Sequence, residues 1–100
     1  MPHTMELVTF KVFDDAEPGF IAANARVNDW LKQQPGFVAR HLARKSDGSW
    51  VDVVLWESRA DAEDAARRMP AEMGESEAMR AIDPATVDMS HGTIGISFSG

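Results

Sequence analysis

The chain has 100 residues, which is enough for one domain and too few for two separate hydrophobic cores. Its 16 acidic residues outnumber the 10 basic ones, and the resulting net charge of -6 argues against nucleic acid as a partner, because such a surface repels phosphates. There is no cysteine, which excludes disulfides, thiolate zinc sites, iron–sulfur clusters and a cysteine nucleophile.

No apolar run in the sequence approaches the roughly 20 residues that a membrane-spanning helix needs. The N-terminal segment 1–6 lacks the basic region and apolar core of a signal peptide. We therefore expect a cytoplasmic protein with no membrane partner, folded as a single domain over residues 1–100.

The first third of the chain predicts a strand followed by a helix. Residues 5–13 are rich in β-branched and aromatic side chains that partly alternate, which favours a strand. The acidic segment 14–19 interrupts it. A helix is then predicted over residues 20–34 by apolar residues at steps of three and four, and Pro35 ends it. Those apolar residues are Phe20, Ala23, Val27 and Leu31.

The middle of the chain predicts a β-hairpin. Strands are expected over residues 37–44 and 50–56, and the Asp47–Gly48 pair between them is a strong turn signal. The second of these strands is apolar on both faces apart from Asp52. Such a strand is usually covered on both sides.

The last part of the chain predicts a helix, a shorter helical piece and a strand. Ser58 is expected to cap the helix, since Asp61 follows it as in a capping box. Pro70 is expected to end that helix. A shorter helical piece over residues 71–81 and a last strand within residues 85–96 follow.

This order of elements predicts an α+β, ferredoxin-like split βαβ fold with an antiparallel four-stranded sheet. Two helices cover only one face of such a sheet. The other face also needs cover, because the strand at 50–56 is apolar on both sides. A second copy of the chain is the simplest cover, so we expect a homodimer.

A family resemblance becomes specific at residues 51–62, where a strand closes in Trp-Glu-Ser and an alanine-rich helix follows. This segment resembles the antibiotic biosynthesis monooxygenase-like family of the dimeric α/β-barrel superfamily. Residues 34–38 are similar to the Pro-Gly-Phe entry to that family's second strand. The resemblance implies a dimeric α/β barrel made of two sheets packed face to face. It also implies a pocket between sheet and helices, lined by Trp56.

The same superfamily includes haem-degrading enzymes, which use an Asn on the first strand, the Trp, and a His on the second helical segment. Here the first strand offers Thr9 and no Asn, and residues 62–80 contain no His. The sequence therefore speaks against haem degradation. Polyketide-oxidising members use Asn, Trp and Arg side chains, and Arg40 supplies the last of these types.

Asn24 and Asn28 lie four residues apart, so they share one face of the predicted helix. Because burying an unpaired amide costs about 1–3 kcal/mol, each either borders a pocket or is hydrogen-bonded to protein. His91 lies on the last predicted strand, in the pocket or at the dimer contact. Met79 belongs to a group of methionines that forms either adaptable core or the lining of a site for a flat ligand.

Two functions remain open on these grounds. One is a cofactor-independent monooxygenase for a small aromatic or polyketide-like molecule, with His91 and Asn28 as catalytic residues. Trp56, Asn24, Arg40 and Met79 would then bind the substrate. The other is a non-catalytic dimer that binds a small ligand. Because no His and carboxylate set has ligand spacing, we predict no metal site, and we expect no bound cofactor.

Overall fold

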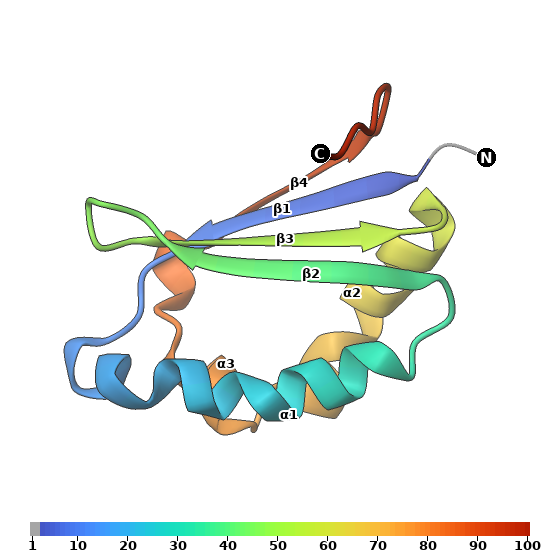
Figure 1. The fold of residues 1–100 in the computed structure, drawn as a ribbon. Coiled ribbons are helices and arrows are strands. Elements are labelled where there is room, and N and C mark those ends of the chain that lie inside the picture. Colours follow the sequence, from blue (N-terminus) through green and yellow to red (C-terminus); the bar gives the residue numbers. More distant parts are fainter. Residues whose placement is uncertain (1–2) are drawn as a thin grey trace.

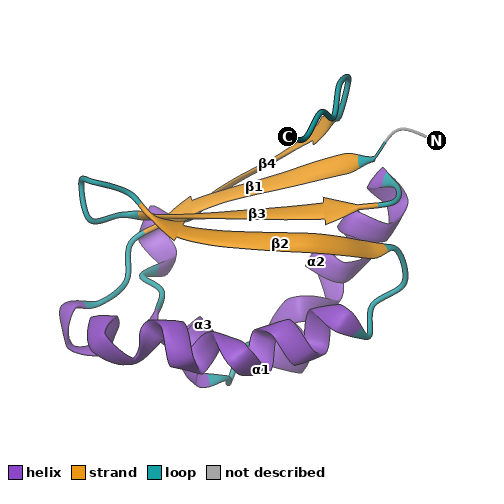
Figure 2. Ribbon diagram, in the orientation of Figure 1, coloured by secondary structure: helices purple, strands orange, loops and turns teal. Residues whose placement is uncertain are grey.

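The computed structural model describes residues 3–100. A four-stranded sheet lies on one side of the molecule and the helices lie on the other (Figures 1 and 2). The strands are β1 (Thr4–Phe10), β2 (Phe37–Arg44), β3 (Trp50–Trp56) and β4 (Asp88–Thr93). The helices are α1 (Phe20–Lys32), α2 (Arg59–Met73) and α3 (Glu77–Ala81), with short 3₁₀ turns at η1 (Asp14–Gly19) and η2 (Pro84–Thr86).

The strand order is β2-β3-β1-β4, and every neighbouring pair is antiparallel. The two outer strands are thus β2 and β4, while β1 and β3 form the centre. This is the predicted α+β, ferredoxin-like arrangement, and the prediction of its sheet is confirmed. The closure of two such sheets into a dimeric barrel stays a prediction.

The strand register aligns polar side chains in one row across the sheet. Arg40 on β2 is opposite Val54 on β3, Val54 is opposite Glu6 on β1, and Glu6 is opposite His91 on β4. Side chains alternate between the faces of a strand, so residues in register share a face. Val54 belongs to the hydrophobic core beneath the helices, which places this row on the helix-covered face.

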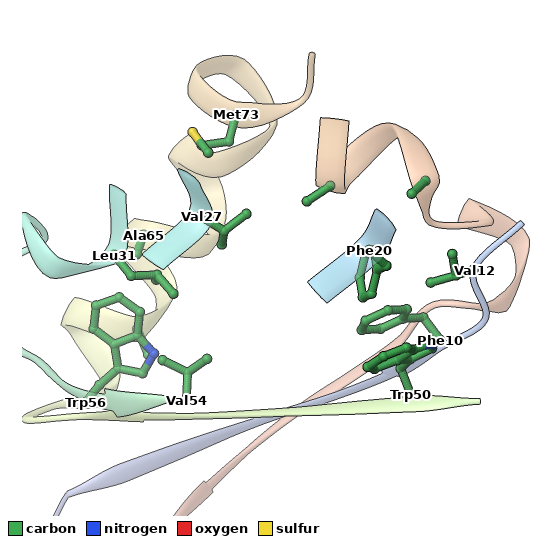
Figure 3. Packing of buried hydrophobic residues seen from close by; sticks show 13 residues of the cluster. Phe10, Val12, Phe20, Val27, Leu31, Trp50, Val54, Trp56, Ala65 and Met73 are labelled. Atoms are coloured by element: carbon green, nitrogen blue, oxygen red, sulfur yellow. The ribbon is translucent and has the colours of Figure 1, made fainter. Parts of the chain in front are cut away.

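The core between sheet and helices is built around two aromatic groups (Figure 3). Phe20 lies edge-on to both Phe10 and Trp50, with ring centroids 5.8 and 4.9 Å apart. At the other end of the sheet, Phe37 lies edge-on to Trp56 at 5.8 Å. Edge-to-face packing of this kind stabilises a core beyond the burial of apolar area alone.

Helix α2 begins as the sequence predicted and ends later. The hydroxyl of Ser58 accepts a hydrogen bond from the backbone N–H of Asp61, which caps the helix. The prediction that Pro70 ends the helix is wrong. Pro70 cannot donate a backbone hydrogen bond, but the backbone N–H of Gly74 still donates to the Pro70 carbonyl, and the helix continues to Met73. The separate helical piece is therefore shorter than predicted and begins at Glu77.

The far face of the sheet has no helix over it (Figure 2). Its central strands present five apolar side chains of opposite parity to the core residues, and each of them is partly exposed: Met5, Leu7, Val51, Val53 and Leu55. Within one chain, the helices therefore cover only one of the two apolar faces of β3.

Among the described residues, no helix has both the length and the apolarity needed to cross a bilayer. Residues 1 and 2, part of the segment in which we expected no signal peptide, lie outside the described residues. The cytoplasmic location stays a prediction.

Candidate functional site

A cavity of about 390 Å³ lies between the sheet and the helices. Its floor comes from β1, β3 and β4, and its walls come from α1, α2 and the segment that runs from α3 to β4. Most lining residues are apolar, and among them are Trp30, Trp56, Met69, Met79 and Met89. A largely apolar cavity of this size suits a small, flat organic molecule.

Trp56 lines this cavity and carries a buried hydrogen-bond donor. The residue is 1% exposed, and its indole Nε1 has no hydrogen-bond partner among the described residues. Figure 3 shows the ring nitrogen on the side that faces Val54, a neighbouring cavity residue. A buried donor without a hydrogen-bond partner costs about 1–3 kcal/mol of stability. A bound ligand that accepted a hydrogen bond from this N–H would remove that cost.

Glu6 brings a carboxyl group to the same cavity. The side chain is 10% exposed, and its Oε2 lies 3.0 Å from Nε2 of His91 on the neighbouring strand. Burial raises the pKa of Glu6 above its ordinary value, and the nearby charge of Asp52 adds to the rise. The hydrogen bond and the charge of His91 oppose it. Burial and the contact with His91 thus act on the pKa of this carboxyl group in opposite directions.

Asp52 is the second carboxylate that lines the cavity, and Arg40 holds it. Nε of Arg40 donates to Oδ1 of Asp52 at 3.0 Å, and Nη2 donates to Oδ2 at 2.8 Å. Two-pronged pairs of this kind fix both side chains in one geometry. The acidic side chain therefore has a defined position at the edge of the cavity.

The two predicted asparagines of α1 complete the surroundings of Arg40. Nη2 of Arg40 donates to Oδ1 of Asn24 at 2.7 Å, and Nη1 donates to Oδ1 of Asn28 at 2.8 Å. The amide of Asn24 in turn donates to the Phe20 carbonyl at 2.8 Å. Asn24 is buried and Asn28 is exposed. Both are bonded to protein, which is one of the two alternatives that the sequence left open.

The structure thus divides the predicted site residues into three groups. Trp56 and Met79 line the cavity. Arg40, Asn24 and Asn28 form a network behind its wall, connected to the cavity through Asp52. His91 is not among the lining residues, and it contacts the cavity through Glu6.

Sequence reasoning missed Glu6 and Asp52 as site residues. A signal for Glu6 was present, since it shares strand parity with Val8 and Phe10, whose side chains face the core. A charged residue on the apolar side of a strand is unusual and often functional. Asp52 stood out as the single polar residue of its strand, but nothing in the sequence showed its pairing with Arg40.

The described part of the chain contains no cluster of three or more His, Cys, Asp or Glu side chains arranged to hold a metal ion.

Comparisons with known proteins agree on the fold. No protein-family model matches this sequence, and neither does any curated protein. Solved structures do match. SnoaB of Streptomyces nogalater, a cofactor-independent oxygenase, is 24% identical with a TM-score of 0.69, over 99% of this chain and 97% of its own.

Two further structures extend the comparison. The monooxygenase ActVA-Orf6 of Streptomyces coelicolor, solved with nanaomycin D, is 21% identical with a TM-score of 0.73, over 99% of this chain and 93% of its own. The haem degrader MhuD of Mycobacterium tuberculosis is 18% identical with a TM-score of 0.76, over 96% and 99% of the two chains. Together with the Trp-Glu-Ser segment at the end of β3, these matches show that the chain has the antibiotic biosynthesis monooxygenase-like fold.

Proposed function

We propose that the protein is a cofactor-independent oxygenase for a small, flat aromatic or polyketide-like molecule that binds in the cavity. One observation carries the proposal: a cavity of about 390 Å³ is walled by aromatic and methionine side chains, among them Trp56, whose indole N–H is buried without a hydrogen-bond partner among the described residues. The oxygenases that share the fold support it, since one of them was solved with the small molecule nanaomycin D.

In such a reaction the substrate supplies all the electrons. A carbon that bears acidic hydrogens loses a proton, and the resulting carbanion reduces O₂ and bonds to it as a hydroperoxide. Loss of water then leaves a carbonyl group, with one oxygen atom in the product and the other in water. The protein has to bind the flat substrate, exclude bulk water and stabilise the anion.

The chain offers groups for each of these tasks. Trp30, Trp56 and the methionines provide faces on which an aromatic ring can stack. The Nε1–H of Trp56 would donate to an oxygen atom on which negative charge develops. Arg40, with Asn24 and Asn28, fixes the position of Asp52 and so shapes one side of the site.

Haem does not fit the site as described. No histidine lines the cavity among the described residues, and His91 is engaged by Glu6. We therefore derive no step that involves haem, although a haem degrader shares the fold.

The fold also supports a homodimer, which we propose forms through the uncovered face of the sheet. The apolar side chains of β1 and β3 on that face are partly exposed in one chain. A second copy would bury the same surface on both partners, as a twofold contact does.

Anthrone is a suitable probe, because its methylene hydrogens are acidic and its oxidation by O₂ gives anthraquinone and water. We expect the protein to accelerate this reaction with one anthraquinone formed per O₂ consumed, as followed by an oxygen electrode and chromatography. Trp56→Phe should slow the reaction, and Ile21→Ala, at an exposed position on α1, should not. Binding of anthrone with no O₂ uptake above the buffer rate would favour the non-catalytic binding protein.

A further inference from the structure

Glu6 combines three properties that the proposed oxygenation does not yet use. Its side chain lines the cavity and is 10% exposed. Its Oε2 is engaged by Nε2 of His91 at 3.0 Å. Among the described residues the only side-chain hydrogen bond of Glu6 is made through Oε2, which leaves Oε1 without a partner there.

The charges around Glu6 come from the sheet alone. Asp52 approaches from β3 and is neutralised by its ion pair with Arg40 from β2, and His91 approaches from β4. The lining residues that α1, α2 and α3 contribute carry no charge. A bound apolar ligand would therefore meet one carboxyl group that is tied to arginine and one that is free to exchange a proton. Two carboxyl groups whose surroundings differ in this way are a common arrangement for acid and base chemistry.

We propose that Glu6 is the catalytic base of the site and that His91 is its positioning residue; this inference rests on the proposed function. Oε1 of Glu6 takes a proton from the acidic C–H or phenolic O–H of the substrate. The electron pair of the broken bond stays on the substrate as an enolate or phenolate. When Nε2 of His91 carries hydrogen, it donates to Oε2 and favours the carboxylate form that can accept a proton.

This inference defines the substrate class more narrowly than cavity shape does. The ligand needs an acidic hydrogen on the side that faces the sheet, where Glu6 lies. An oxygen atom that accepts a hydrogen bond from the indole N–H of Trp56 would strengthen its binding. A flat ring system that carries both groups, as anthrones do, satisfies these two requirements.

Proton transfer can be measured separately from oxygenation. In D₂O without O₂, a base in the cavity exchanges the methylene hydrogens of anthrone for deuterium, which mass spectrometry follows. We expect the wild-type protein to accelerate this exchange and Glu6→Gln to lower the protein-dependent rate about a hundredfold. Glu57→Gln, at an exposed glutamate next to Trp56, is the matched control and should exchange as the wild type does.

The role of His91 can be tested through the pH dependence of the exchange rate. His91→Ala removes the hydrogen bond and charge that lower the pKa of Glu6, so the exchange rate should reach its half-maximum at a higher pH. His91→Gln, which can still donate to Oε2, should restore part of the rate. A role in folding alone would change the amount of active protein and leave this pH profile where it is.

The outcomes of these experiments distinguish the role of Glu6 from the proposed oxygenase activity. Exchange by Glu6→Gln at the wild-type rate would overturn the inference and leave the oxygenase proposal standing if O₂ uptake persists. Anthrone that quenches tryptophan fluorescence but does not exchange in the wild type would also overturn it. Exchange that depends on Glu6, without O₂ uptake, would support the base and contradict the oxygenase. No binding of anthrone would count against both. Near-ultraviolet circular dichroism and the conservative Glu6→Asp variant, which should keep part of the exchange rate, separate loss of the base from loss of the fold.

Discussion

Arg40 and Asp52 form an ion pair across β2 and β3, with Nη2 of the arginine 2.8 Å from Oδ2 of the aspartate. Their side chains are 7% and 16% exposed. Burial makes the two groups depend on each other, because either charge alone would remain poorly solvated. Asn24 and Asn28 extend the pair to α1.

We therefore expect Arg40→Met to lower the free energy of unfolding by about 3 kcal/mol, as when one partner of a buried ion pair is lost. Urea unfolding followed by tryptophan fluorescence measures this change. Arg59→Ala breaks an exposed pair with Glu63 and should cost less than about 1 kcal/mol. Similar costs for the two variants would show that Arg40 contributes no more than a surface charge.

Glu6 should make stability depend on pH. Its pKa is raised in the folded state from the ordinary 4.5, chiefly by burial, so the folded protein holds this proton more tightly than the unfolded chain does. The stabilisation from the protonated carboxyl is fully present below pH 4.5 and is lost as pH rises through the folded-state pKa.

Glu6→Gln removes this titration. The unfolding free energy of the variant, relative to wild type, should therefore rise as pH increases from about 4 to 7. Parallel denaturant titrations of the two proteins at several pH values measure the difference, and Glu57→Gln is the control at an exposed glutamate. A difference that is constant over this range, or that falls, would contradict the raised pKa.

Gly36 should not tolerate a side chain. Its φ is +79°, a conformation that L-residues rarely adopt, and a Cβ there would collide with the side chain of Asp61 at the start of α2. We expect Gly36→Ala to lower the thermal midpoint by several degrees, equivalent to about 1–3 kcal/mol. At Gly19 a Cβ would meet nothing within 4 Å, so Gly19→Ala should leave the midpoint nearly unchanged. Equal midpoints for both variants would contradict this.

The proposed dimer predicts a solution mass of twice 11.0 kDa by light scattering at micromolar concentration. Val53 lies opposite Leu7 at the centre of the uncovered sheet face. Val53→Asp would place a charge in the contact and should give a monomer, because a buried unpaired charge is costly. Ile21→Asp, on the exposed side of α1, should stay dimeric. A wild-type protein of 11.0 kDa that stays monomeric on concentration would refute the interface.

Haem titration should produce no saturable shift of the Soret band, because no described cavity residue offers an imidazole ligand. Absorbance spectra with and without the protein test this directly. If a shift appears and His91→Ala abolishes it, the protein binds haem through His91, and a haem enzyme replaces the cofactor-independent oxygenase as the proposed function. A shift that survives in His91→Ala would point to another ligand.

The sequence predicted the elements better than it predicted the site. The strands over residues 37–44 and 50–56 have the predicted bounds, because the hairpin turn at Asp47–Gly48 and the apolar run after it are local signals. The error at Pro70 arose because the proline removes one backbone N–H, while the bond from the Gly74 N–H to the Pro70 carbonyl keeps the next turn helical. Contacts between strands that are far apart in the sequence are not encoded by local patterns. The pairing of Glu6 with His91 depends on the β1–β4 register, which no local pattern encodes.

The arginine network also bears on how the cavity can be redesigned. Because Arg40 ties Asn24 and Asn28 of α1 to the sheet, the wall formed by α1 is held by polar bonds of fixed geometry. The part of the wall that comes from α2 and α3 presents Met69 and Met79, whose unbranched side chains adopt many shapes. Substitutions that widen the range of accepted ligands should therefore start at these methionines, where volume can change while the anchored wall keeps its place.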